Sequence, residues 1–173
     1  FFTINKTEIN ALRDKLLSKQ GFSDHSLWEE IDFYNVEEPF AFVSIIQHQD
    51  SRDKRYILIE PPLNEKEKQA YDFIYKTLHV ISVDTDSIEQ KGTTNILEES
   101  VNEIISDYSI KISEVQKEKI LYYLKKNLLS LDKLDPIMKD HQIEDISCDG
   151  SEVSLFLYHR KHGSIQSNIQ FDD

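Results

Sequence analysis

The sequence predicts an α+β fold. An N-terminal β-hairpin and helix unit is followed by a helical stem and then by a small antiparallel meander that begins an α/β domain. Three observations support this fold class. Two apolar runs, at residues 40–48 and 55–60, have the composition of strands. Helical stripes with N-terminal caps occupy much of residues 64–128. Apolar and polar residues alternate again from Ile143 onward, as in a half-buried strand.

The first expected element is a helix over residues 7–18, with Thr7 as its N-cap. Its apolar residues share one face: Ile9, Leu12, Leu16 and Leu17. Residues 1–20 are mildly basic within an acidic chain, which would suit a helix that docks on a partner or on a membrane surface. An amphipathic helix packed on the core is commoner and is the favoured interpretation.

Two strands and a helix are expected next. The strands are "FAFVSIIQH" and "RYILIE", joined by the polar link "QDSRDK", and Pro61 and Pro62 end the second strand. The helix begins after Asn64, because Asn64 and Glu67 have the spacing of a capping box. Its apolar stripe contains Tyr71, Ile74, Tyr75 and Leu78.

A polar stretch at residues 83–94 is the expected linker, since it contains Gly92 and a pair of threonines. The predicted domains are therefore an N-terminal unit of residues 1–82 and a C-terminal unit of residues 95–173.

Two capped helices open the C-terminal unit. Asn95 and Glu98 are expected to cap the first, and Ser113 and Gln116 form the S-x-x-Q capping box of the second. Their apolar faces contain Leu97, Val101, Ile104, Ile105 and Tyr108 in the first, and Ile120, Leu121, Leu124 and Leu128 in the second.

The corner that follows the helices is the stretch "DPIMKDHQIEDISCDG". Asp135 is the expected N-cap of a short helix with Pro136 at its first position. A strand begins at Ile143, and Asp149-Gly150 is the dipeptide of a tight hairpin turn. The turn "RKHG" leads to a third strand, expected as an unpaired edge of a sheet that looks unfinished.

Composition and charge exclude several classes of function. The 20 basic and 32 acidic residues give a formal charge of −12, which disfavours binding of nucleic acid by the whole domain. The single Cys148 can form neither an intrachain disulfide nor, alone, a thiolate metal site, which favours a reducing compartment. No apolar run reaches the roughly 18 residues of a membrane span.

Motifs for nucleotide binding and catalysis are missing from the sequence. The four glycines, at positions 21, 92, 150 and 163, are too far apart for a phosphate-binding loop or a dinucleotide fingerprint. No catalytic serine elbow or paired-histidine zinc helix occurs. A hydrolase could use scattered carboxylates such as Glu144, Asp145 and Asp149, but these positions also suit strand ends and turns, so this reading ranks last.

The most basic point of the second half is "HRKH" at residues 159–162. It is either a solvated hairpin tip or a contact to an anion, in which Arg160 and Lys161 would supply the charge. A metal site is an alternative of low weight, because the spacing of its four residues matches no standard zinc pattern. Those residues are His141, Cys148, His159 and His162.

Two pairs of segments carry a resemblance to a known family. They are "DPIMKDHQIEDISCDG" followed by "VSLFLYHRKHGSIQSNIQF", and upstream "RYILIEPPLNEKEKQAYDFIYKTL" and "ILYYLKKNLLSLDKLDPIM". Over residues 34–173 the chain resembles the N-terminal region of archaeal secretion ATPases. These motors of the type II/IV secretion superfamily drive assembly of archaeal pili and of the archaellum. The Walker motifs of their RecA-like ATPase domain do not occur in these 173 residues.

The resemblance implies a non-catalytic N-terminal domain of a hexameric motor. Its expected partners are its own ATPase domain, neighbouring subunits of the ring and a polytopic membrane platform protein, with no nucleic acid. The expected location is cytoplasmic, at the inner face of the membrane. ATP and Mg²⁺ would bind the intact protein rather than this region, where Arg160 and Lys161 could approach nucleotide at a domain interface. A stand-alone acidic α+β adaptor that binds other proteins is the alternative.

Overall fold

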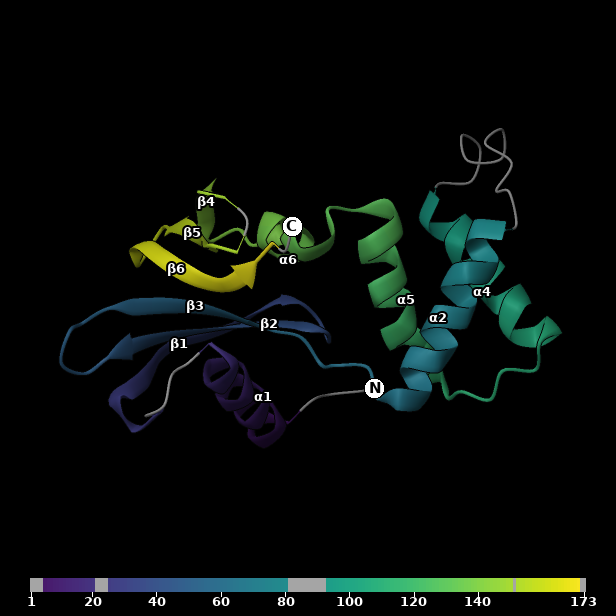
Figure 1. Ribbon diagram of the computed structural model, residues 1–173, viewed down its shortest axis with the longest axis horizontal. Coiled ribbons are helices and arrows are strands. Elements are labelled where there is room, and N and C mark those ends of the chain that lie inside the picture. Colours follow the sequence, from purple (N-terminus) through teal and green to yellow (C-terminus); the bar gives the residue numbers. More distant parts are fainter. Residues whose placement is uncertain (1–4, 21–24, 81–92, 151, 172–173) are drawn as a thin grey trace. The chain divides into compact units, whose positions relative to one another are not determined.

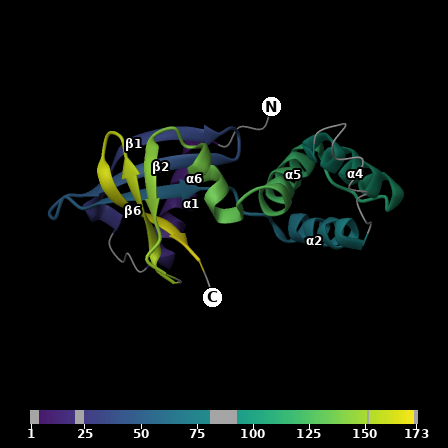
Figure 2. The same ribbon diagram turned by 90° about the horizontal axis from the view of Figure 1, so that it is seen from above.

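The computed structural model describes residues 5–20, 25–80, 93–150 and 152–171 (Figures 1 and 2). The chain forms two compact units, one from Phe1–Pro61 together with Pro136–Asp173 and the other from Pro62–Asp135. The α+β class is therefore confirmed. The division differs from the predicted one, because the helical unit interrupts the chain between two segments that share one sheet. Residues 83–92, most of the predicted linker at 83–94, lie outside the described residues.

The first unit contains a six-stranded sheet of order β1-β2-β3-β6-β5-β4. Its strands are β1 (Trp28–Glu37), β2 (Ala41–His48), β3 (Lys54–Ile59), β4 (Ile143–Ser147), β5 (Ser154–His159) and β6 (Gly163–Gln170). All neighbours pair antiparallel except β3 and β6, which pair parallel. The expectation that the third strand of the meander is an unpaired edge is wrong, because β6 lies inside the sheet between β3 and β5.

The parallel junction of β3 and β6 is short and is extended by one side chain. Backbone pairing covers Arg55 with Gln166 and Tyr56 with Ser167. Beyond it, the Asn168 side chain replaces a peptide group: its Oδ1 accepts from Leu58 N–H at 2.8 Å, and its Nδ2 donates to the Leu58 carbonyl at 2.9 Å. The amide of Asn168 thus satisfies both backbone groups of a buried residue.

Helix α1 (Lys6–Lys19) packs on one face of β2 and β3. The shared core contains Ile9, Leu17, Phe42, Ile46, Ile57 and Ile59. The helix starts earlier than predicted, with Asn5 rather than Thr7 as its N-cap, because Asn5 and Glu8 form a reciprocal capping box. A short 3₁₀ turn, η1 (His25–Leu27), leads into β1.

Strand β1, with the sequence "WEEIDFYNVE", was not predicted. It is an edge strand, and one-residue bulges at Ile31 and Val36 shift its register against β2. Each bulge moves the following side chains to the opposite face, so the alternation that marks a strand is broken twice.

The C-terminal segment begins with α6 (Asp135–Lys139), a continuation of the 3₁₀ turn η2 (Asp132–Leu134). Asp135 has helical dihedrals of φ −53° and ψ −48°, so it is part of the helix rather than its predicted extended N-cap. The hairpin between β4 and β5 is also longer than predicted. Its last described pair is Ser147 with Phe156, and Gly150 has a positive φ of 137° within the wider connection.

The described residues of the second unit form three α-helices, α2 (Glu65–Val80), α4 (Thr93–Asp107) and α5 (Glu114–Leu129). The capping boxes predicted at Asn64 and Ser113 are confirmed. Asn95 is not a cap, because α4 already begins at Thr93. The helices enclose an apolar core of Ala70, Ile74, Leu78, Leu97, Val101, Ile104, Ile120, Leu121 and Leu124. Within the described residues, no helix combines the length and apolarity needed to cross a membrane.

One ion pair is buried among these helices. Lys119 Nζ lies 2.8 Å from Glu67 Oε2, which also accepts from the backbone N–H of Asn64. Burial alone would raise the pKa of the Glu67 carboxyl, but the hydrogen bonds from Lys119 and Asn64 outweigh it and lower the pKa. The capping box of α2 therefore also ties that helix to α5.

Candidate functional site

A buried carboxylate joins the two segments of the sheet unit. Asp140, in the corner between α6 and β4, is only 5% exposed. Its Oδ2 accepts hydrogen bonds from the hydroxyls of Tyr34 in β1 and Tyr56 in β3, each at 2.8 Å. Its Oδ1 accepts from the Gln142 N–H at 2.8 Å. Three donors therefore compensate the burial of this carboxylate.

His159 of β5 extends this cluster and has a defined tautomer. Its Nδ1 accepts from the Lys161 backbone N–H at 3.1 Å, so the ring proton of the neutral form is on Nε2. Nε2 lies 3.1 Å from the Tyr34 hydroxyl, which donates to Asp140. The ring is 1% exposed, and this burial, with the nearby charge of His162, lowers the pKa of His159. The imidazole is therefore neutral at pH 7 and is a hydrogen-bond donor to Tyr34.

The two tyrosines remain protonated over the whole physiological range. Burial, followed by the negative charge of Asp140, raises the pKa of both the Tyr34 and the Tyr56 hydroxyl. Both hydroxyls can therefore donate to Asp140. We call these four residues, His159, Tyr34, Tyr56 and Asp140, the Asp140 cluster. His159 donates a hydrogen bond to Tyr34, and both tyrosine hydroxyls donate to the carboxylate of Asp140.

The bulge at Ile31 separates two acidic residues of β1. Glu30 lies on the face covered by α1 and accepts from Arg13 at 3.0 Å and from Ser44 at 2.7 Å. Asp32 lies on the opposite face, with Lys161 Nζ at 2.8 Å and His162 Nε2 at 3.1 Å. Without the inserted residue, two side chains spaced by two positions would share a face.

Asp32 is held in its charged form by these neighbours. The hydrogen bond from Lys161, together with His162 and despite partial burial, lowers the pKa of the Asp32 carboxyl. The turn between β5 and β6 is thereby fixed to β1 by an ion pair between residues far apart in the sequence.

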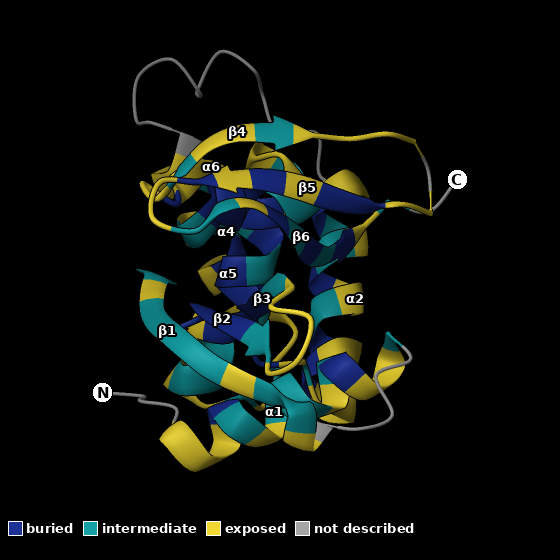
Figure 3. Cartoon of the chain, turned by 90° about the vertical axis from the view of Figure 1, so that its left-hand side faces the viewer, coloured by how far each residue is buried: buried dark blue, intermediate teal, exposed yellow. Residues whose placement is uncertain are grey.

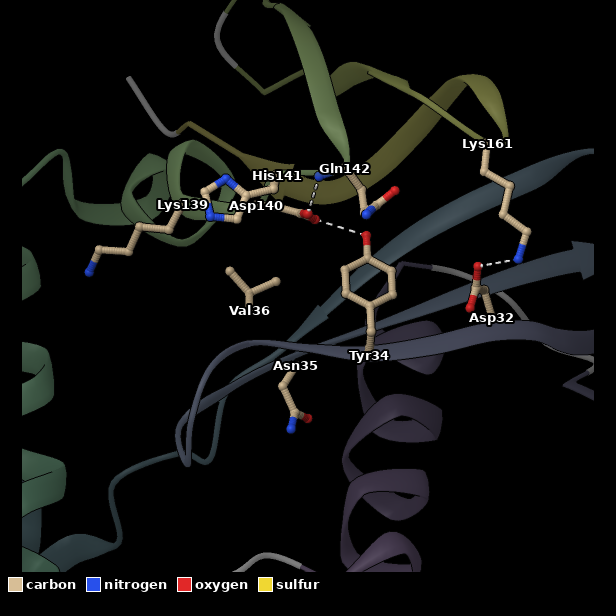
Figure 4. A pocket seen from close by; sticks show the side chains of 9 residues that line it. All are labelled: Asp32, Tyr34, Asn35, Val36, Lys139, Asp140, His141, Gln142 and Lys161. Carbon is tan, nitrogen blue, oxygen red and sulfur yellow. Dashed lines mark hydrogen bonds and ion pairs between the residues drawn. The ribbon is translucent and has the colours of Figure 1, made fainter.

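A hollow of about 480 Å³ lies beside the Asp140 cluster (Figure 4). Its lining comes from β1, from the corner after α6 and from the turn after β5: Asp32, Tyr34, Asn35, Val36, Lys139, Asp140, His141, Gln142 and Lys161. Figure 4 shows Tyr34 pointing toward Asp140, and Lys161 pointing toward Asp32. Lys139 pairs with Glu37 at 2.8 Å. The charged groups that line the hollow are thus engaged with protein partners, and the site is suited to holding segments together.

The two residues predicted to contact an anion have different surroundings. Lys161 lines the hollow in its ion pair with Asp32. Arg160 is on the surface, with Nε 3.3 Å from Glu144 Oε1. The turn is therefore more than a freely solvated tip, and a role of either residue toward nucleotide stays a prediction.

The four residues of the alternative metal site do not come together as a ligand set. The rings of His159 and His162 are 4.8 Å apart, His141 lines the hollow, and Cys148 is exposed. Among the described residues, no group of three or more histidine, cysteine or acidic side chains could hold a metal ion.

Sequence reasoning missed the residues at the centre of the site. Tyr34 belongs to the strand that was not predicted, and Tyr56 was read only as part of an apolar run. The available signal was Asp140, an acidic residue in a short corner after a proline-initiated helix, where a carboxylate can accept local backbone hydrogen bonds.

Comparison with known proteins gives one family match and two relatives. Residues 5–62 match a family described as "PilB3-like, N-terminal". The uncharacterized protein MJ1288 of Methanocaldococcus jannaschii is 30% identical over 151 residues, which cover 84% of this chain and 60% of that protein. The uncharacterized protein MJ0900 of the same organism is 31% identical over 160 residues, which cover 81% of this chain and 28% of that protein.

The chain thus spans less than two thirds of either relative. The family match covers α1 and β1–β3, the first of the two segments that build the sheet unit. This segment therefore resembles the N-terminal region of a PilB-like secretion ATPase.

Proposed function

We propose that this chain is a non-catalytic N-terminal region of a PilB-like secretion or pilus motor ATPase. The observation that carries the proposal is the family match over residues 5–62, which ends one residue after the first segment of the sheet unit. The sequence is in keeping with this proposal, because its four glycines are too far apart for a phosphate-binding loop.

The geometry suits a domain that transmits displacement to a partner. The sheet is built from two distant segments, and the Asp140 cluster and the pair of Asp32 with Lys161 fix these segments to each other. A unit held in this way moves as one body, so a displacement applied at its C-terminal segment reaches α1 and β1. In the complete motor, ATP and Mg²⁺ would bind the ATPase domain, and a ring of six subunits would act on a polytopic membrane platform protein at the inner face of the membrane.

The test compares three proteins: the complete gene product, the same product without this region, and this 173-residue chain. We expect the complete and the shortened proteins to hydrolyse ATP and the chain alone to hydrolyse none. Only the complete protein should restore filament assembly in cells that lack the gene. A complete gene product without ATPase activity would refute the proposal and would favour the stand-alone adaptor. Filament assembly that is unchanged without this region would also refute it.

A further inference from the structure

Strand β5 has one buried face and one aromatic, exposed face. Leu155 and Leu157 are buried, whereas the alternate residues Phe156 and Tyr158 are 37% and 51% exposed. Figure 3 shows this alternation along β5. The strand lies inside the sheet between β4 and β6, where aromatic side chains at positions two apart form a continuous apolar strip.

The neighbours of this strip are short or polar. In the pairing register, Phe156 lies between Ser147 and Gln166, and Tyr158 lies between Asp145 and Ser164. Paired residues project from the same face of a sheet. The two aromatic side chains therefore extend farther from the sheet than the smaller side chains of their paired neighbours. We call this surface, formed by Phe156, Tyr158, Asp145, Ser147, Ser164 and Gln166, the β5 face.

The β4 side of the β5 face is negatively charged. Glu144, Asp145 and Asp149 are all exposed on β4 and on the connection that follows it. Of the nearby cations, Arg160 is paired with Glu144 at 3.3 Å, and Arg55, the partner of Gln166 in β3, lies over the Trp28 ring. The whole chain carries a formal charge of −12. A partner with basic residues beside its apolar ones would therefore match this surface in charge.

We propose that the β5 face binds a basic amphipathic helix of a partner protein. A helix is the element that covers the face of a sheet, and its diameter of about 10 Å spans about two strand spacings of about 4.8 Å each. The aliphatic stripe of the helix would lie along Phe156 and Tyr158. Its lysines or arginines would reach the two exposed acidic residues of β4, Glu144 and Asp145. Aromatic residues at the centre with a polar, charged rim are the usual composition of a protein interface.

This inference rests on the proposed role of the chain as a partner-binding region and names the chemistry of one partner. The probe is a fluorescein-labelled peptide of about 15 residues, a length at which an isolated helix becomes marginally stable, with Leu and Lys placed at helical spacing. Fluorescence anisotropy measures its binding to the 173-residue chain. A peptide of the same pattern with Glu in place of Lys is the charge control.

We expect the Leu–Lys peptide to bind and the double variant Phe156→Thr/Tyr158→Thr to bind it at least about tenfold more weakly. Threonine keeps the strand propensity, so the sheet should persist. The matched control is Phe73→Ala/Tyr108→Ala, which removes an exposed aromatic pair with ring centroids 4.9 Å apart in the helical unit. This control should change the affinity by less than about twofold, and the Leu–Glu peptide should bind at least about tenfold more weakly than the Leu–Lys peptide.

Three results would overturn the inference: no binding of the Leu–Lys peptide, an equal loss in both double variants, or equal binding of the Leu–Glu peptide. If the threonine variant does not fold, Tyr158→Lys tests the same surface, because it places a cation at the centre of the face on a half-exposed position. The peptide assay needs no ATPase domain. A complete gene product that hydrolyses no ATP would therefore refute the proposed function and leave the peptide result standing.

Discussion

Replacement of Asp140 by alanine should destabilise the sheet unit strongly. The change removes the acceptor of three hydrogen bonds, from Tyr34, Tyr56 and the Gln142 N–H. Tyr34 and Gln142 line the hollow, so water can replace part of what they lose. Tyr56 is 0% exposed, so its hydroxyl would stay unsatisfied. One buried unsatisfied donor costs about 1–3 kcal/mol and each partly compensated hydrogen bond about 0.5–1 kcal/mol, which gives a total of about 3 kcal/mol.

Urea unfolding followed by tryptophan fluorescence measures this loss, because the single tryptophan of the chain, Trp28, lies in β1 of the same unit. With a slope of about 1–2 kcal/mol per molar urea, the midpoint should fall by about 1.5–3 M. The exposed Asp145 provides the control, and Asp145→Ala should change the free energy of unfolding by less than about 0.5 kcal/mol.

A double-mutant cycle measures the coupling between Tyr56 and Asp140. Tyr56→Phe should destabilise the parent by about 1 kcal/mol, but it should be neutral or stabilising in Asp140→Ala, because the hydroxyl then has no acceptor. If the two losses simply add, or if Asp140→Ala matches the Asp145→Ala control, the Asp140 cluster does not join the two segments as described.

Four further outcomes are expected. The pKa of His159 is lowered in the folded state, so the unfolded state binds more protons below about pH 6.5. The free energy of unfolding therefore falls as the pH decreases. In His159→Gln the free energy of unfolding should lose this dependence between about pH 5 and 7. Lys119→Met leaves Glu67 buried without its cation, which should lower the free energy of unfolding by about 3–5 kcal/mol. Thermal unfolding followed by circular dichroism at 222 nm measures this loss. The double variant Lys119→Met/Glu67→Leu should recover most of the lost stability. Asn168→Ala leaves two backbone groups unsatisfied and should lower the urea stability by about 2–3 kcal/mol. Arg160→Ala should leave the melting temperature within about 1–2 °C but lower ATP turnover or its coupling to filament assembly in the complete motor.

Each of these expectations has a result that contradicts it. If the free energy of unfolding of His159→Gln still falls with decreasing pH as in the parent, His159 does not take up a proton on unfolding. Equal losses in Lys119→Met and in Lys117→Met, whose partner Glu114 is exposed, would show that the buried pair has no special weight. If Asn168→Ala loses no more stability than Ser164→Ala, an exposed change on the same strand, the Asn168 amide does not stabilise the junction of β3 and β6. Unchanged turnover and assembly in Arg160→Ala would show that the turn has no role toward nucleotide.

The elements with strong local signals were predictable from the sequence. Helix α1 was placed within one residue at each end, and the capping boxes at Asn64 and Ser113 fixed the starts of α2 and α5, since these depend on side chains only three positions apart. Strands β2 and β3 followed from their continuous apolar runs. Strand β1 could not be read in this way, because its two bulges and its exposed edge remove the alternation.

Long-range pairing could not be predicted from local patterns. Nothing near Asn168 in the sequence indicates that its amide bonds to Leu58, 110 residues away. The Asp140 cluster was missed for the same reason, since its four side chains come from three strands and one corner in two distant segments. The adjacent charges of Arg160 and Lys161 indicate a basic turn, but their pairing with Glu144 and Asp32 is not visible in the sequence.

The placement of the helical unit between the two sheet segments has a consequence for biosynthesis. The three helices make mostly local contacts and can fold as soon as they leave the ribosome, whereas the sheet must wait for β6, which is synthesised last. Until β6 is made, the edge of β3 that pairs with β6 is open, and residues that are buried in the complete fold can contact other nascent chains. A recombinant piece that ends at residue 62, the limit of the family match, keeps this edge permanently open. We therefore expect the sheet unit to fold only when both segments are present, in one chain or with residues 136–173 supplied as a second polypeptide.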